Sequence, residues 1–371
     1  MKVPFSYLDR QFQDVDAYLA DIRQLVLSGD FTLGKPLTEF EGSFAKKVGM
    51  PHAVGVGTGT DALIMPMKLC GIGPGDEVIT TTMTFYATVG AIVATGARPV
   101  LVDSEDGFMI DPSKIEEAIT SKTKAILTVT FSGNIPDMEA VATIARKHNL
   151  MIFEDTCQSI GGLLDGKPMG SWGRAAGYSL HPLKNLNVWA DGGVVVTRED
   201  DLARQLRLYR NHGLVNRDEI EMFGINCRLD TIQAVVGNRL LPQLEFITNR
   251  RIEIALRYDQ AWEDMADCLQ PPRRRPGVRH VYHLYMVRAK RRDDLLRHLQ
   301  ARGVQAKIHY PKPIHLQPAA SVLGYPPGRF PKAEQDCREI ITLPAHQHLT
   351  EEEIEFTIRC VREFYQKAST P

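Results

Sequence analysis

The first two-thirds of the chain alternates short, mostly apolar runs with segments of helix length. Strands that alternate with helices pair in parallel, because each connection must cross one face of the sheet before the next strand begins. The pattern therefore predicts the α/β class, with a mostly parallel, seven-stranded sheet flanked by helices. The predicted strands are 53–56, 77–80, 98–102, 124–129, 150–154, 176–179 and 194–197, and the predicted helices include 85–95, 112–119 and 136–148.

The pattern of apolar runs and helix-length segments changes after about residue 245, which indicates a second domain. At 371 residues the chain is long enough for two domains. We predict a large domain over residues 1–248 and a smaller C-terminal α/β domain over residues 249–371. Its predicted elements are a charged helix at 248–266, strands at 282–288 and 304–309, and helices at 293–301 and 351–366.

Composition and charge exclude several classes of function. The 44 basic and 45 acidic residues nearly cancel, and the one dense basic run, Arg273–Arg275, lies between prolines and is interpreted as a solvated linker. Nucleic-acid binding proteins usually carry a basic excess or stripe, so we expect no nucleic-acid partner. We expect no membrane partner, because no apolar stretch approaches the ~18 residues of a spanning helix. No signal peptide is visible and the six cysteines are scattered, which predicts no metal site and a cytoplasmic location.

A turn rich in glycine and threonine, Gly55–Leu63, follows the first predicted strand and leads into a helix near residues 62–69. Helix starts offer free N–H groups and the positive end of the dipole, which suit a phosphate. The spacing matches neither a P-loop nor a GxGxxG motif, since no Gly-Lys-Ser/Thr follows and the third glycine is missing. An anion site and a plain tight turn are therefore both open for this segment.

Two further polar segments follow the ends of predicted buried strands. Glu154 and Asp155 end one strand, at the sheet edge where ligands of open α/β sheets bind. A carboxylate there could cap a helix, bind a metal or pair with a protonated ring nitrogen. Ser179 ends another strand, and Lys184 follows five residues later in an apolar setting. A lysine in a loop is usually solvated, but desolvation would lower its pKa and suit it to Schiff-base chemistry.

Together the three segments match the needs of pyridoxal 5'-phosphate (PLP). Its phosphate needs N–H donors and a hydroxyl, which the glycine-threonine turn and Ser179 could supply. Its ring nitrogen needs an acid to stay protonated and its aldehyde needs an amine, which Asp155 and Lys184 could supply. Phe85, at the head of a predicted helix, could stack on the ring, and plain core packing is the alternative.

The sequence resembles the fold-type-I enzymes that use PLP, and within them the sugar aminotransferases of the DegT/DnrJ/EryC1/StrS family. The resemblance extends along nearly the whole chain, from Phe31–Gly34 to Leu343–Pro344. Several family motifs occur in the same order, which makes a chance match improbable. These motifs are GTGTDAL, GDEVITTTMTFYAT, FEDTCQS, YSLHPLKNL, DGGVVVT, RNHG, GINCRLDTIQA and KIHYPKPIHLQPA.

The resemblance implies roles for individual residues. Lys184 would be the catalytic residue, holding the cofactor by its aldehyde and then moving the proton. Asp155 would pair with the pyridine nitrogen and Gln158 with the ring hydroxyl. Asn226 would reach the phosphate of the neighbouring subunit, which implies a homodimer with shared active sites. The implied cofactor-binding residues are Thr60, Asp61, Phe85, Asp155, Gln158, Ser179, Lys184 and Asn226.

The resemblance also implies a reaction, in which an amino group passes from glutamate or glutamine to the keto group of a nucleotide-linked sugar by a ping-pong mechanism. The segment 309–318 and the ADGG after the lysine most resemble enzymes that aminate C-3 of dTDP-linked 3-keto-6-deoxyhexoses. His309, Tyr310 and His315 are candidate substrate contacts, and a proline-rich loop that only packs at the domain interface is the alternative.

Other functions remain open at this point. The enzyme could aminate C-4, another keto sugar or a cyclitol, or the chain could bind PLP as a regulator without turnover. Relatives that dehydrate sugars carry histidine in place of the lysine, so Lys184 argues against a dehydratase. A desulfurase would need a reactive cysteine on a flexible loop, and Cys157 is the only cysteine near the predicted site.

Overall fold

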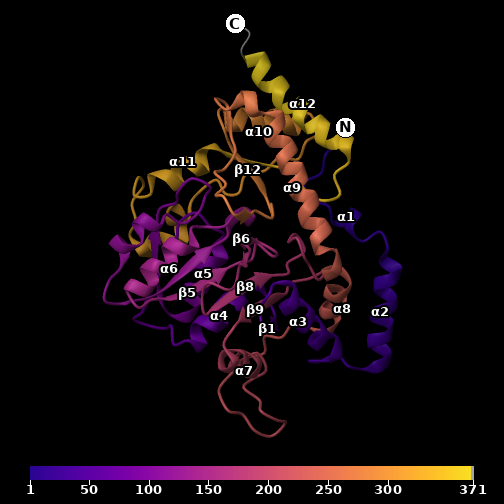
Figure 1. Ribbon diagram of the computed structural model, residues 1–371, viewed down its shortest axis with the longest axis vertical. Coiled ribbons are helices and arrows are strands. Elements are labelled where there is room, and N and C mark those ends of the chain that lie inside the picture. The colour runs from indigo at the N-terminus through magenta and orange to yellow at the C-terminus, as the bar shows by residue number, and fades with distance from the viewer. Residues whose placement is uncertain (369–371) are drawn as a thin grey trace.

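The computed structural model describes residues 1–368, and a seven-stranded sheet forms its centre (Figure 1). Four neighbouring strand pairs are parallel, and the two pairs made by β9 are antiparallel. The predicted α/β class and mostly parallel sheet are therefore confirmed. In spatial order the strands are β1 (His52–Val56), β9 (Gly193–Thr197), β8 (Ala175–Ser179), β5 (Met151–Asp155), β4 (Thr123–Val129), β2 (Glu77–Thr81) and β3 (Arg98–Val102).

Helices cover both faces of this sheet, because successive side chains of a strand point to opposite faces. Val195 packs in one apolar cluster with Leu63 and Leu206, whereas Val194 and Val196 pack in another with Phe40. The first face carries α4 (Gly59–Leu69), α5 (Tyr86–Thr95) and α7 (Asp200–Tyr209), and the second carries α3 (Lys35–Lys47), α6 (Met138–Lys147) and α8 (Thr231–Leu240).

A smaller antiparallel sheet lies beside the large one. Its strands are β10 (Leu269–Gln270), β12 (Tyr285–Ala289) and β13 (Ile340–Leu343). Its core is shared with α9 (Leu244–Ala261), α10 (Arg292–Ala301) and α12 (Glu351–Ala368). The remaining α-helices and strands of residues 1–368 are α1 (Leu8–Gln11), α2 (Val15–Ser28), α11 (Pro331–Glu339), β6 (Leu163–Leu164), β7 (Lys167–Pro168) and β11 (Val278–Arg279).

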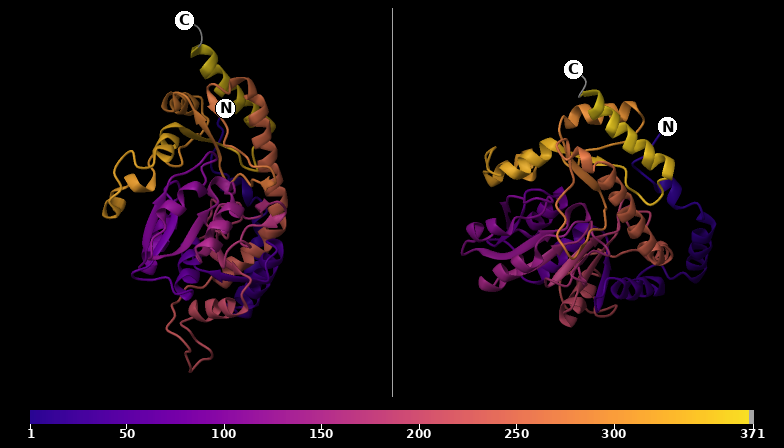
Figure 2. Two further views of the ribbon diagram at one scale, coloured as in Figure 1. Left: turned by 60° about the vertical axis from the view of Figure 1, so that its left-hand side comes forward. Right: turned by 45° about the horizontal axis from the view of Figure 1, so that its top comes forward.

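The chain crosses the predicted domain boundary at residue 248 inside a helix. Helix α9 is continuous from Leu244 to Ala261, and it runs from α8 up to the smaller sheet (Figures 1 and 2). The N-terminus also joins the smaller unit, since Val3 is fully buried in its core and forms a bridge with Val304. The division at residue 248 therefore remains a prediction.

Three local predictions were wrong. Residues 112–119 form two short 3-10 turns, because Ile119 already returns to an extended backbone and leaves too few residues for an α-helix. The segment 304–309 makes only isolated bridges at Val304 and Lys307. Arg275 bonds to Glu105 at 2.6 Å and Asp137 at 2.8 Å, and Arg274 pairs with Asp259. Arg274 and Arg275 are therefore held by carboxylates of both units, and only Arg273 of this run is exposed, so the run is not a solvated linker.

No helix within residues 1–368 is both long enough and apolar enough to span a membrane.

Candidate active site

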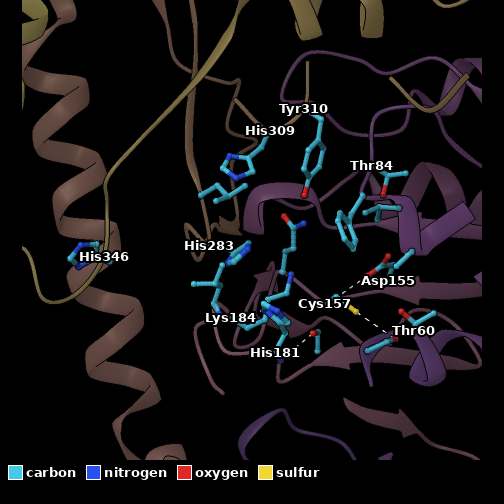
Figure 3. Close-up of a pocket in the computed structure, with 18 of the residues that line it drawn as sticks. Thr60, Thr84, Asp155, Cys157, His181, Lys184, His283, His309, Tyr310 and His346 are labelled. Carbon is cyan, nitrogen blue, oxygen red and sulfur yellow. Dashed lines mark hydrogen bonds between the residues drawn. The ribbon is translucent and has the colours of Figure 1, made fainter. Parts of the chain in front are cut away.

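A pocket of about 410 Å³ lies at the carboxyl ends of β4, β5 and β8, where the large sheet meets the smaller unit (Figure 3). Val129, Asp155 and Ser179, the last residues of these strands, line it together with the start of α4. Leu343 and Ala345 of the smaller unit also line it. Ligands of open α/β sheets bind at this edge because the chain leaves the strands there and diverges into loops.

Asp155 ends β5, and both of its carboxylate oxygens accept hydrogen bonds. The Thr88 hydroxyl donates to Oδ2 at 2.7 Å, and the backbone N–H of Cys157 donates to Oδ1 at 3.1 Å. Thr88 is in turn bonded to the Thr84 hydroxyl at 2.7 Å. These bonds fix a buried carboxylate against the pocket, which is the arrangement that a protonated ring nitrogen requires.

Lys184 lies in the loop after β8, and its backbone is held from two sides. Its N–H donates to the carbonyl of His181 at 2.8 Å, and its own carbonyl accepts from the Tyr7 hydroxyl at 3.0 Å. Burial lowers the pKa of Lys184, and the nearby Cys157 and Asp155 oppose that shift. A lysine with a lowered pKa supplies a neutral amine more readily than a solvated one, as Schiff-base chemistry requires.

The start of α4 and the end of β8 form a cradle of donors. Thr58 caps the helix, because its hydroxyl accepts from the Asp61 N–H at 3.0 Å. The N–H groups of Gly59 and Thr60 have no partner within the helix. A Cβ at Gly59 would lie 2.6 Å from the Ser179 Cβ, so only glycine lets the helix start approach that hydroxyl this closely. This donor set fits a phosphate. The Asp61 N–H is already engaged by Thr58.

Gln158 and Phe85 face the same pocket. The Gln158 side-chain oxygen accepts from the Ser132 N–H at 2.6 Å, so its amide NH₂ is the group left to donate to a ligand. The Phe85 ring is 42% exposed and lies 5.8 Å from the Tyr310 ring, centre to centre. An aromatic ring that is open on one side at this place can stack on a flat ligand.

The predicted substrate contacts divide into two groups. His309 and Tyr310 line the pocket (Figure 3), and burial lowers the pKa of His309 to about 4. His315 is absent from the pocket wall, and its side chain is 0% exposed. Its ring nitrogens are bonded to Thr82 at 2.9 Å and Glu334 at 3.0 Å. We therefore withdraw His315 as a substrate contact, because both of its polar atoms are used inside the protein.

Asn226 lies away from the pocket of its own chain, in the long loop after α7, where it forms a bridge with Asn211. Its predicted role concerns a neighbouring subunit and stays a prediction.

Sequence reasoning missed several residues that line or support the pocket. Thr84 and Thr88 flank Phe85 within the motif GDEVITTTMTFYAT, which was the available signal for them. The others are brought there from distant parts of the chain, so neither spacing nor periodicity marks them. The largest group is basic or aromatic and comes from the N-terminus, α9 and the smaller unit. The missed residues are Tyr7, Thr84, Thr88, Arg251, His283 and His346.

A model of the DegT/DnrJ/EryC1/StrS aminotransferase family matches residues 13–362. The chain belongs to this family. Among curated relatives of this aminotransferase, a "Pleiotropic regulatory protein" of Geobacillus stearothermophilus is 38% identical over 369 residues, which cover 99% of each chain. The "dTDP-3-amino-3,4,6-trideoxy-alpha-D-glucose transaminase" of Streptomyces venezuelae is 39% identical, over 99% of this chain and 97% of the relative.

The fold of this aminotransferase is also similar to solved structures. The X-ray crystal structure of DesV from S. venezuelae, in complex with a ketimine intermediate, superposes with a TM-score of 0.95. The two chains are 39% identical, and the match covers 98% of each. The resemblance stated from the sequence motifs is thus confirmed.

Proposed function

We propose that the protein is a PLP-dependent aminotransferase that moves an amino group from glutamate to the C-3 keto group of a nucleotide-linked sugar, such as a dTDP-linked 3-keto-6-deoxyhexose. One observation carries this proposal. Lys184, whose pKa is lowered by burial, lines the same pocket as the hydrogen-bonded carboxylate of Asp155. The amino donor and acceptor would use this pocket in turn, which gives ping-pong kinetics.

The residues around the pocket fit PLP. When bound, the cofactor supplies an aldehyde that accepts the amino group and a ring that withdraws electrons. Lys184 would hold the aldehyde end and move a proton at Nζ, and the Asp155 carboxylate would lie beside the ring nitrogen. Thr60 and Ser179 would bind the phosphate. Gln158 would donate to the ring hydroxyl, and Phe85 would cover one ring face.

His309 and Tyr310 lie on the other side of the pocket from Thr60, where a sugar would approach Lys184 (Figure 3). The name of the Streptomyces venezuelae relative supports C-3 of a dTDP-sugar as the acceptor, since its product carries the amino group at C-3. Amination at C-4, or of another keto sugar or a cyclitol, is the alternative.

The long loop after α7 supports a homodimer with shared active sites. This loop projects from the foot of the molecule (Figure 1) and carries Asn226. It also holds Phe223, 92% exposed, and Ile220, 49% exposed. Exposed apolar side chains grouped on one loop are typical of a surface that another subunit covers. Asn226 would then reach the phosphate of the neighbouring active site.

Two other functions are disfavoured. Burial raises the pKa of Cys157 well above its usual value, so this thiol lacks the reactivity that a desulfurase needs. A regulator without turnover is suggested by the name of the Geobacillus relative. Such a protein has no need of a lysine poised to move protons, and Lys184 is present with its pKa lowered.

The test begins with the absorbance spectrum of the purified protein with PLP. Glutamate should convert the protonated-imine band into the pyridoxamine band, and a nucleotide keto sugar should then restore it. Lys184→Ala should lose the imine band and the turnover together. If wild type shows no band after PLP is supplied, or if Lys184→Ala keeps full turnover, the proposal is wrong. A regulator would bind PLP but yield no amino sugar.

A further inference from the structure

Arg251, in the middle of α9, is a buried cation without a counter-ion. It is 2% exposed, which makes it the most buried arginine of residues 1–368. The other two buried arginines each pair with a carboxylate: Arg210 with Glu41 and Arg292 with Asp293. Arg251 makes no ion pair with any carboxylate in the described chain, although a buried charge is normally paired.

The partners that Arg251 does have are all neutral. Its Nε donates to the Gln347 side-chain oxygen at 3.0 Å, and its Nη1 donates to the carbonyls of Tyr282 at 3.1 Å and His283 at 3.2 Å. The guanidinium also interacts with the hydroxyl of Tyr7 and lies 5.1 Å from the centre of its ring. Its Nη2 is buried and has no hydrogen-bond partner in residues 1–368. One edge of the group is therefore left for an acceptor.

Arg251 belongs to a wall of the active-site pocket that is rich in unpaired nitrogen atoms. The pocket is lined by Arg251, His283 and His346, and Figure 3 shows both histidines on the side of Lys184 away from Thr60. His283 Nδ1, His346 Nδ1 and Gln347 Nε2 are also buried without partners in the part of the chain that the structure describes.

The carboxylates that line the pocket do not neutralise this wall. Asp155 is bonded to Thr88 and Cys157 at the end of β5. Asp191 is exposed and lies beside His181. The fixed positive charge of this wall comes from Arg251, whose unpartnered Nη2 can donate to an anion. His346 donates through Nε2 to the carbonyl of Pro4, so its Nδ1 is left as an acceptor.

We propose that Arg251 binds a carboxylate of the amino donor. The proposal rests on the proposed aminotransferase function, and it assigns the donor to amino acids that carry this anion. A guanidinium presents parallel N–H groups that match the two oxygens of a carboxylate. The carboxylates of an amino acid such as glutamate lie within a few bonds of the amino group, which would have to react at the aldehyde end that Lys184 holds. The phosphates of a nucleotide sugar lie beyond the sugar ring, farther from the reacting carbon.

Glutarate, which is glutamate without its amino group, tests this site without turnover. Its dissociation constant from the PLP-loaded protein is measured by calorimetry for wild type, Arg251→Gln and Gln347→Glu. Gln347→Glu keeps the size and the acceptor oxygen of the glutamine and places a competing carboxylate beside Arg251. This variant should keep or raise the melting temperature, so a binding defect is not a folding defect. Gln24→Glu, at an exposed position of α2, adds the same charge as a matched control.

We expect Arg251→Gln and Gln347→Glu to weaken glutarate binding by about ten-fold or more, which corresponds to losing one charge-assisted hydrogen bond. Gln24→Glu should leave the binding unchanged. Unchanged glutarate affinity in Gln347→Glu, or no glutarate binding to wild type, would overturn the proposal. A loss of dTDP affinity in these variants without a loss of glutarate affinity would also overturn the proposal, because it would assign Arg251 to the nucleotide. If wild type binds glutarate through Arg251 but glutamate transfers no amino group, the proposed function fails while the carboxylate site stands.

Discussion

The Thr88 hydroxyl, in the first turn of α5, donates a 2.7 Å hydrogen bond to Oδ2 of Asp155 at the end of β5. The bond joins a helix to a neighbouring part of the sheet and orients the carboxylate that would face the cofactor ring. Thr84 bonds to the same hydroxyl at 2.7 Å, so the position of Asp155 depends on a short chain of polar side chains.

Replacing Thr88 with valine should slow the glutamate half-reaction while leaving PLP bound. Valine has the same shape but cannot donate, and a hydrogen bond to a charged group is worth about 1.5–3 kcal/mol, or roughly 10–100-fold in rate. The measurement is the rate of the imine-to-amine spectral change. Thr95→Val is the matched control, because Thr95 is buried at the other end of α5 and bonds only to neighbouring backbone. Equal rates in the two variants would show that Thr88 does not position Asp155.

Gly59→Ala should weaken PLP binding. The new methyl group would lie 2.6 Å from Ser179 Cβ and would push the start of α4 away from the serine hydroxyl. We expect the dissociation constant of PLP to rise by about ten-fold or more, equivalent to one lost charge-assisted hydrogen bond. Gly42→Ala in α3 is the control, since its Cβ meets no atom within 4 Å. That change should stabilise the protein by about 0.5–1 kcal/mol. If Gly59→Ala binds PLP normally, the cradle is not at this helix start.

The attachment of PLP to the apoprotein should show a pH midpoint below the usual pKa of lysine. Burial lowers the pKa of Lys184, and only the neutral amine reacts. Asp155→Asn removes a charge that raises this pKa, so its midpoint should fall further. The measurement is the rate of imine formation at saturating PLP across a pH series. A midpoint at or above that of a solvated lysine would contradict the prediction.

The lowered pKa of Lys184 also makes the stability of the apoprotein depend on pH. Lys184 binds its proton less tightly in the folded protein than in the unfolded chain, so the unfolded chain holds more protons between the two pKa values. The contribution of Lys184 to the free energy of unfolding of the apoprotein should therefore rise with pH across this window. Lys184→Met should remove that part of the pH dependence in chemical denaturation.

Phe223→Asp should convert the proposed dimer into monomers. The side chain is 92% exposed on the loop after α7, and a charge there would be desolvated if another subunit covered it. Sedimentation measures the mass, and PLP affinity should fall together with it because Asn226 would no longer reach the neighbouring site. Val322→Asp, at a residue that is 81% exposed elsewhere on the surface, is the control. A Phe223→Asp variant with the mass of wild type would exclude this loop as the interface.

The sequence determined the sheet and the chemistry at its edge. Apolar runs mark each of the seven central strands, and Asp155, Ser179 and Lys184 stand at or just after strand ends in the sequence. Residues at such ends share one edge of a parallel sheet whatever the details of packing, which is why they could be brought together without a structure.

Tertiary structure decided what each neighbouring polar group does. Glu154 and Asp155 are adjacent in sequence, yet Glu154 accepts backbone N–H bonds from Gly170, Trp172 and Gly173, and Asp155 faces the pocket. His309 and His315 share one proline-rich segment, yet only His309 lines the pocket. Arg251 and Thr88 acquire their roles from segments far away in the chain. Local pattern fixes the period and the ends of a strand, whereas the partner of a polar side chain is set by contacts that form only when distant segments pack.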